Sequence, residues 1–184
     1  MSKIETNKID SISGTSTLKI GETNATTLDF DTGITSVTNI PKALTNTPAY
    51  HAYGSAATSI PNNSATLLPF NTELFDTDNA YDTSTYFFTP QVAGKYFVFG
   101  QFRLNTSTDL DNVECIVRKN GSNLTPPRFG SIFNGNQNTA SVTTVVDMNG
   151  STDYIGIYAV QYSGSSQTLV TNGQYAFAYR LIGV

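Results

Sequence analysis

The sequence predicts an all-β protein, a two-sheet jelly-roll sandwich preceded by an extended N-terminal segment of short strands. Three observations support this fold class. Thr, Tyr and Phe, which suit pleated strands, are abundant, whereas helix-forming residues are scarce. Strand-like runs follow one another at the regular spacing of a sandwich, and none shows a helical period. Clusters of Gly, Asn, Asp and Ser separate the runs, as tight turns require.

Each expected strand is a short stretch of apolar, aromatic or β-branched side chains between two turn clusters. Two dipeptides, Asn120-Gly121 and Asn149-Gly150, predict hairpins because a primed turn needs positive φ at its central residues. From residue 49 onward, strands are expected at 49–53, 66–70, 86–88, 94–104, 113–119, 128–133, 141–147, 154–161 and 174–182.

The composition of the chain changes near Pro48. Residues 1–47 contain no Tyr and one Phe, and their short apolar pieces are separated by Thr, Ser and Asn. Such pieces suit short strands with one apolar face, but they are too few to close a core alone. We therefore expect an attachment or shaft segment over residues 1–47 and a head domain over residues 48–184. A disordered leader is the alternative for the first segment.

The run Tyr96-Phe97-Val98-Phe99 is apolar on both alternations, although a sandwich strand normally buries one face and exposes the other. The core of the sandwich covers one of these faces. The second face requires a further cover, which is either a sister subunit or the N-terminal segment of the same chain.

Charge and cysteine usage disfavour several classes of partner. The net charge of −4 and the pI of about 4.7 provide no basic surface, so we expect no nucleic-acid partner and no membrane insertion. The N-terminus lacks the apolar region of a Sec signal, which predicts synthesis in a cytoplasm. Cys115 is the single cysteine. It excludes an internal disulfide, and we expect it to be a small buried hydrophobic residue.

The residues of familiar catalytic sites are missing from the sequence. His51 is the only histidine, and no Ser or Cys lies in a nucleophile motif. We therefore expect no enzyme and no cofactor, with His51 an ordinary strand residue. Asp76, Asp78 and Asn79 begin like a calcium loop, but the Gly and the Glu that such a loop needs are absent. The expectation is a solvated turn without a metal, and calcium on these three side chains is the alternative.

A dense motif lies at the start of the expected head domain. Phe70-Asn71 is followed by Tyr81-Asp82, then by Phe88-Thr89-Pro90 and Gly94-Lys95-Tyr96-Phe97. This series resembles the signature of the complement globular-head and tumour-necrosis-factor-like jelly rolls. The pieces "VRKNGSNL", "TVVDMNGSTDYIGIYAVQYSG" and "YAFAYRLIGV" are similar to the same family. The resemblance covers about residues 48–184, but the chain departs from the family in having no collagen stalk and no tryptophan.

The resemblance implies a compact homotrimer whose inner sheets meet along a threefold axis. A strand that is apolar on both alternations would then have its own sandwich on one side and sister subunits on the other. The residues expected at the trimer interface are Tyr96, Val98, Phe99, Tyr175, Phe177 and Tyr179.

Residues 1–47 resemble the leading segments of tailed-bacteriophage fibre and appendage proteins, in which short Thr- and Gly-punctuated strands intertwine. This second resemblance implies a structural virion protein, a short homotrimeric tail fibre or knob that is made in the host cytoplasm. Residues 1–47 would attach it to other virion proteins. The alternatives are a capsid decoration or head-fibre protein and, from a different class, a cellular adhesin or a depolymerase head.

An adhesive head would contact host-cell carbohydrate or protein through its polar loops, which are expected at 105–112, 122–127, 134–139 and 163–168. Aromatic rings near these loops suit the face of a sugar, and amides and hydroxyls suit its hydroxyl groups. The side chains expected to contact a receptor are Phe129, Asn136, Tyr162 and Ser165.

Overall fold

The computed structural model describes residues 45–105, 112–124, 130–134 and 137–183, of which 130–134 and 137 are described by their backbone alone. All of these residues belong to one compact unit. The segment expected over residues 1–47 lies almost wholly outside the described residues, so the division near Pro48 stays a prediction.

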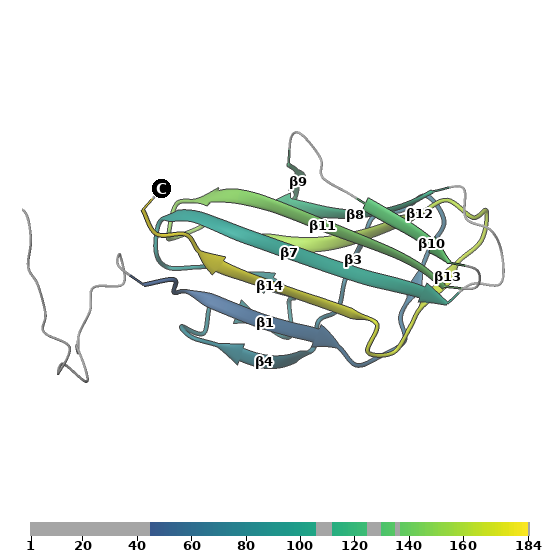
Figure 1. Ribbon diagram of the computed structural model, residues 1–184, viewed down its shortest axis with the longest axis horizontal. Helices are drawn as coiled ribbons and strands as arrows, with labels where there is room; N and C mark the ends of the chain where they lie inside the picture. The colour runs from purple at the N-terminus through teal and green to yellow at the C-terminus, as the bar shows by residue number, and fades with distance from the viewer. Residues whose placement is uncertain (1–44, 106–111, 125–129, 135–136, 184) are drawn as a thin grey trace, which may run out of the picture. The chain divides into compact units, whose positions relative to one another are not determined.

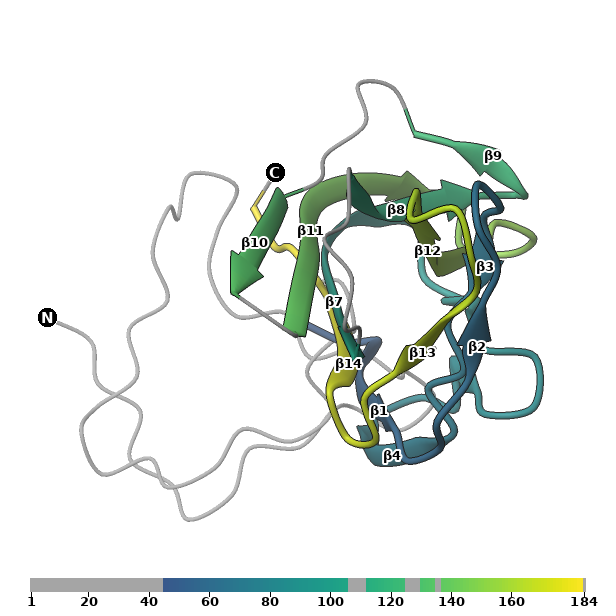
Figure 2. The same ribbon diagram turned by 90° about the vertical axis from the view of Figure 1, so that its right-hand side faces the viewer.

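Two antiparallel sheets pack face to face and confirm the predicted jelly-roll sandwich (Figure 1). Figure 2 shows the sheets on opposite sides of the interior, which their side chains fill. The larger sheet has the order β10 (Gly130–Asn134), β11 (Gln137–Met148), β7 (Gly94–Asn105), β14 (Gln174–Arg180), β1 (Ala49–Gly54) and β4 (Thr72–Asp76), with β13 (Gln167–Leu169) pairing β7 and β2 (Ser59–Ile60). The smaller sheet has the order β5 (Tyr81–Asp82), β6 (Phe87–Phe88), β12 (Ile155–Gln161), β8 (Val113–Lys119) and β9 (Ser122–Asn123), with β3 (Thr66–Leu67) pairing β12.

The central strand β7 supplies one row of the core. Tyr96, Val98 and Leu104 point between the sheets, and each is 0% exposed. Gly100 belongs to the same row, and a Cβ built on it would lie 2.6 Å from Cγ2 of Ile157 in the opposite sheet. The missing side chain therefore lets β7 and β12 approach closely at this point.

A second part of the core is built from the motif that the sequence singled out. The rings of Tyr50 and Tyr81 stack with centroids 4.5 Å apart, and Tyr50 also packs on Phe88 at 4.8 Å. The Tyr81 hydroxyl donates a hydrogen bond of 2.8 Å to the carbonyl of Phe70. Burial raises the pKa of both tyrosines. Phe70, Tyr81 and Phe88 thus act as one packing unit that joins the larger sheet to the smaller one.

Most of the long strands lie close to their predicted bounds, but β11 begins four residues before the predicted start at 141, and several short edge strands were not predicted. β8 has the predicted bounds, and β7 extends one residue beyond them. β4 falls where a loop was expected, and β13 overlaps the loop expected at 163–168. β4 lies at the edge of its sheet, and its central residues Glu73, Leu74 and Phe75 are all exposed, so no alternation of burial marks it.

The prediction of a hairpin at Asn120-Gly121 is confirmed. Lys119 pairs with Ser122 across the turn between β8 and β9. Asn120 has φ of 51° and Gly121 has φ of 79°, as a primed turn requires.

The prediction of a hairpin at Asn149-Gly150 is wrong, because this turn joins β11 of the larger sheet to β12 of the smaller one. The Asn149 Oδ1 accepts hydrogen bonds from three successive backbone N–H groups, beginning with that of Ser151 at 2.9 Å. Gly150 has φ of 71°, and a Cβ on it would lie 2.2 Å from the backbone nitrogen of Ala93. The dipeptide therefore makes a tight turn, but the chain changes sheets there.

One carboxylate connects this crossover to the neighbouring hairpin. Asp153 accepts a hydrogen bond of 2.8 Å from the Asn120 side chain and one of 2.8 Å from the backbone N–H of Asn149. Its Oδ2 lies 2.7 Å from Nζ of Lys119. The hydrogen bond from the Lys119 ammonium and, to a smaller extent, that from the Asn120 amide hold the pKa of Asp153 below its ordinary value.

We expect Asp153→Asn to destabilise the head by about 1 to 3 kcal/mol at pH 7, because it leaves a partly buried cationic partner and a backbone donor poorly satisfied. A carboxyl group whose pKa is lowered by folding stabilises the protein above its unfolded value, here near 3.8, and that contribution disappears as the pH falls through the folded value. Thermal unfolding of the wild type and the variant should therefore differ at pH 7 and converge as the pH falls below 3.8 and through the folded pKa of Asp153.

Asp147→Asn is the matched control for this experiment. Asp147 pairs with Lys95 at 3.0 Å, but both side chains are largely in solvent. An exposed pair contributes less than about 1 kcal/mol. Equal losses of stability in the two variants would contradict the structural role given to Asp153.

Candidate functional site: an aromatic face on the larger sheet

The sequence of β7 is apolar on both alternations, and the structure shows where each of the two apolar rows lies. Tyr96 and Val98 point into the sandwich, whereas Phe97 and Phe99 point away from it and are partly exposed. The second apolar row of β7 therefore lies on the outer face of the larger sheet.

The register of the neighbouring strands brings further rings beside this row. Phe97 is paired with Tyr179 of β14, and Phe99 is paired with Phe177. The ring centroids of Phe99 and Phe177 are 5.0 Å apart with planes 14° from parallel, and those of Phe97 and Tyr179 are 5.3 Å apart. Cross-strand aromatic pairs of this kind stabilise a sheet and hold one another in place.

The rings continue across β1 to the edge strand. His51 of β1 lies opposite both Phe177 and Phe75, at centroid distances of 5.9 Å and 6.1 Å. On the other side Val145 of β11 is paired with Phe97 and is 50% exposed. We call this surface the aromatic face, and its members are His51, Phe75, Phe97, Phe99, Val145, Tyr175, Phe177 and Tyr179.

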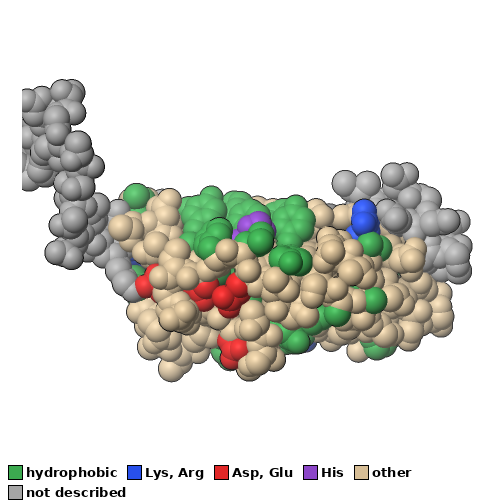
Figure 3. Space-filling view, turned by 90° about the horizontal axis from the view of Figure 1, so that it is seen from below, with side chains coloured by type: hydrophobic (Ala, Val, Ile, Leu, Met, Phe, Trp, Pro, Cys, Tyr) green, Lys and Arg blue, Asp and Glu red, His purple; other side chains and the backbone are tan. Residues whose placement is uncertain are grey.

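Figure 3 shows the aromatic face along the upper border of the molecule, where hydrophobic side chains gather around the single histidine. The acidic side chains visible in this view lie outside that cluster. Partial burial among the rings lowers the pKa of His51. The imidazole is therefore biased toward its neutral form, and the face presents apolar surface with little charge.

The arrangement of the aromatic face suits association with another surface. Strands lie about 4.8 Å apart and alternate residues along a strand about 6.8 Å apart, so three rows on five strands cover on the order of 300 Å². Contiguous apolar patches of a few hundred Å² mark interaction surfaces on soluble proteins.

Four of the six residues predicted at a trimer interface lie on this face: Phe99, Tyr175, Phe177 and Tyr179. The structure moves Tyr96 and Val98 out of that set, because both are 0% exposed inside the sandwich. A second copy cannot reach them while the two sheets stay packed.

Four members of the aromatic face were missed by the sequence prediction: His51, Phe75, Phe97 and Val145. Phe97 follows from the alternation once Phe99 is placed outward. His51 was treated as an ordinary strand residue, and Phe75 was assigned to a loop. Their positions depend on the pairing of β1 with β14 and β4, which the sequence does not reveal.

Of the four residues predicted for receptor contact, the structure describes two, Tyr162 and Ser165. Ser165 is exposed in the turn after β12, where its carbonyl accepts hydrogen bonds from Gln161 and Ser163. Tyr162 is partly buried, and its N–H donates to the carbonyl of Asn112. Phe129 and Asn136 lie outside the described residues.

The expected solvated turn at Asp76 has a structural explanation. The Asp76 carboxylate accepts hydrogen bonds from the backbone N–H groups of Asp78 and Tyr81, at 3.2 Å and 2.7 Å. Within the described parts of the chain, no group of three His, Cys, Asp or Glu side chains is placed to hold a metal ion.

The single thiol is enclosed by the core. Cys115 of β8 is 0% exposed, and its Sγ lies 3.6 Å from the carbonyl oxygen of Gly100. Burial raises the pKa of this thiol, so it does not form a nucleophilic thiolate. Among the residues that the structure describes, no helix has the length and hydrophobicity to cross a membrane.

Comparison with known proteins supports the fold. No family model matches the chain, and no curated protein matches it. Among solved structures it is similar to murine APRIL at pH 8.5, with a TM-score of 0.52, 14% identity, and coverage of 72% of this chain and 98% of that one. Murine APRIL at pH 5.0 gives a TM-score of 0.51 at 13% identity, over the same shares of the two chains.

Eiger from S. frugiperda is a further structural neighbour, with a TM-score of 0.48, 10% identity, and coverage of 74% of this chain and 93% of that one. At these identities the likeness concerns the fold alone. It rests on the APRIL structures, which confirm the tumour-necrosis-factor-like jelly roll that the sequence motif predicted.

Proposed function

We propose that the protein is a homotrimeric, non-enzymatic binding and structural module whose subunits meet through the aromatic face. The single observation that carries this proposal is the outward row of Phe97 and Phe99, continued by Tyr175, Phe177 and Tyr179. A monomer would expose this row to water, which carries a risk of uncontrolled association. A closed ring of three copies covers it.

The fold supports a trimer over other closed assemblies. Tumour-necrosis-factor-like jelly rolls assemble as homotrimers through their inner sheets, and the larger sheet of this chain carries an apolar outer surface that suits such an assembly. Self-association through one repeated surface needs no partner of different chemistry. The proposal also accounts for a central strand that is apolar on both alternations.

For the biological setting we propose a bacteriophage virion, in which residues 1–47 attach the trimer to other virion proteins and the head binds the host surface. Support comes from the short apolar pieces separated by Thr, Ser, Asn and Gly in residues 1–47, and from the low share of charged residues in the chain, 13%. The protein would be made in the host cytoplasm and function in the particle. A role as capsid decoration uses the same trimer at a different place, and microscopy of the particle separates the two.

We expect Phe177→Glu to convert the trimer to monomer, because a trimer would bury three unpaired carboxylates, each at a cost of several kcal/mol. Light scattering at micromolar concentration measures the change in mass. Tyr158→Glu is the matched control, since Tyr158 is also a partly exposed ring in a central strand, but it lies on the outer face of the smaller sheet under Arg118. A monomeric wild type, or a trimeric Phe177→Glu variant, contradicts the proposed interface.

We expect the trimer to weaken as the pH falls from 8 to 5. Partial burial already lowers the pKa of His51 below 6.5 in the single subunit, and further burial at the interface would lower it again. The contribution of His51 to assembly is therefore complete above the pKa of the separate subunit and is lost as the pH falls through the lower pKa of the assembled one. Each unit of difference in pKa between assembled and separated subunits changes the equilibrium about tenfold per histidine. His51→Phe should remove this dependence below pH 6.5 while it keeps an aromatic ring at this position. An unchanged pH dependence in the variant would contradict the placement of His51.

We expect a chain that begins at Pro48 to stay folded and trimeric but to fail to join particles. Electron microscopy of virions assembled with the full-length and the shortened chain measures incorporation and shows whether the protein occupies the tail or the capsid. Unfolding of the shortened chain would show that residues 1–47 belong to the head. Normal incorporation would remove their role in attachment.

A further inference from the structure

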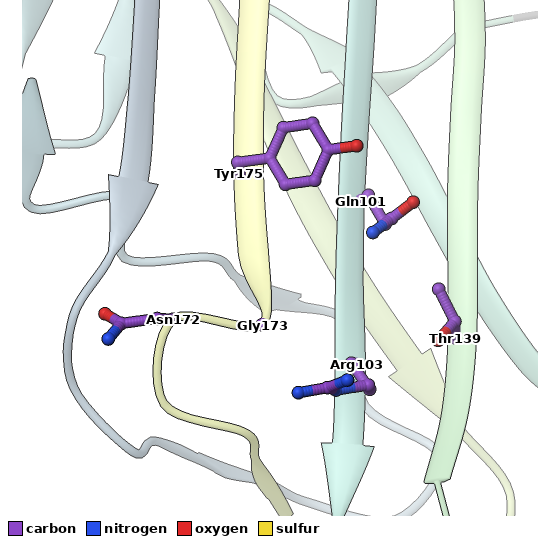
Figure 4. A pocket seen from close by; sticks show the side chains of 6 residues that line it. All are labelled: Gln101, Arg103, Thr139, Asn172, Gly173 and Tyr175. Carbon is purple, nitrogen blue, oxygen red and sulfur yellow. The ribbon is translucent and has the colours of Figure 1, made fainter. Parts of the chain in front are cut away.

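The outer face of the larger sheet changes character toward the end of β7. After Phe97 and Phe99 the next outward residues are Gln101 and Arg103. A cavity of about 200 Å³ opens at this point, which is smaller than the usual 300 to 1,000 Å³ of a drug-sized site and suits one small ligand. Figure 4 shows the residues that line it: Gln101, Arg103, Thr139, Asn172, Gly173 and Tyr175.

The cavity is built on paired strands and a fixed turn. Arg103 lies opposite Thr139 of β11, and Gln101 lies opposite Tyr175 of β14. The turn that precedes β14 is held at the backbone, because Val170 donates a hydrogen bond of 2.8 Å to the carbonyl of Arg103. Side chains on paired strands are positioned better than those on a free loop, so the polar groups are arranged before a ligand arrives.

One donor of the Arg103 guanidinium, its Nε, has no hydrogen-bond acceptor among the described residues. This Nε is buried. None of the six lining residues is acidic. By contrast, Lys95 and Lys119 pair with aspartates at 3.0 Å and 2.7 Å. A buried donor without an acceptor is unfavourable, and a charged donor more so, which favours an anionic group in the cavity.

We infer that this cavity binds a carboxylate-bearing sugar. The planar guanidinium of Arg103 matches a carboxylate with two parallel hydrogen bonds. The amides of Gln101 and Asn172 and the hydroxyl of Thr139 can donate to or accept from sugar hydroxyls. The ring of Tyr175 supplies an aromatic wall against which a sugar ring can pack.

The inference names a ligand class for the adhesive role proposed above and rests on that role for its biological setting. The cavity is lined by residues of one chain and shares Tyr175 with the aromatic face, whereas its other five lining residues lie outside that face. Binding of the sugar and the state of assembly are therefore measured separately.

The experiment compares two probes that differ only at C6, methyl β-D-glucuronide and methyl β-D-glucoside, with acetate as a bare carboxylate. Calorimetry and ligand-observed NMR on the full-length protein measure the affinities. We expect a millimolar Kd for the glucuronide and at least tenfold weaker binding of the glucoside and of acetate. Arg103→Gln should weaken glucuronide binding at least tenfold, Arg103→Lys less, and Thr139→Val several-fold, with unchanged mass by light scattering.

Several outcomes would overturn the inference. Equal affinity for glucuronide and glucoside would show that the carboxylate is not recognised. Equal affinity for glucuronide and acetate would show that the sugar ring is not recognised. Full glucuronide binding by a folded Arg103→Gln variant would show that Arg103 does not bind the carboxylate. A wild-type trimer that binds no glucuronide rejects the sugar site but not the proposed assembly. If Arg103→Gln then dissociates that trimer, the acceptor for Arg103 is a carboxylate of a second copy of the chain. A wild-type monomer that binds it rejects the assembly alone.

Discussion

The strict alternation of side chains along β7 is the constraint on which the rest of the structure depends. This strand lies in the middle of the larger sheet and has apolar residues on both of its faces. Its inward residues Tyr96 and Val98 anchor the core, and its outward residues Phe97 and Phe99 begin the aromatic face. A shift of one residue in its register would exchange these rows and leave both the core and the surface mispacked.

The placement of charge follows the same division. Asp76 and Asp153 are engaged by backbone N–H groups at turns, so these carboxylates serve the connections between strands. The central rows of the larger sheet's outer face carry rings instead. Charged side chains stand at the two ends of the outward row of β7: Lys95, which pairs with Asp147, and Arg103, where the polar cavity begins. The face therefore has two chemically distinct parts, one for burial and one for directed hydrogen bonds.

The sequence predicts the long strands well because their apolar period of two and their turn residues are local signals. β8 is matched residue for residue, and the turn at Asn120-Gly121 needs only its own backbone angles. The same signal misleads at Asn149-Gly150, since a dipeptide that favours positive φ does not say which sheet the next strand joins. Tyr96 and Val98 were assigned to the wrong face for a related reason. Periodicity shows that two faces exist, but the pairing of distant strands decides which one is inside.

The enclosure of Cys115 has a consequence for the chemistry of the intact protein. The only thiol of the chain lies at the contact between β8 and the backbone of β7, with no exposed surface. Reagents that alkylate or oxidise sulfur must wait until the two sheets separate. The rate at which Cys115 is modified therefore reports how often the sandwich opens, and the measurement requires no introduced label.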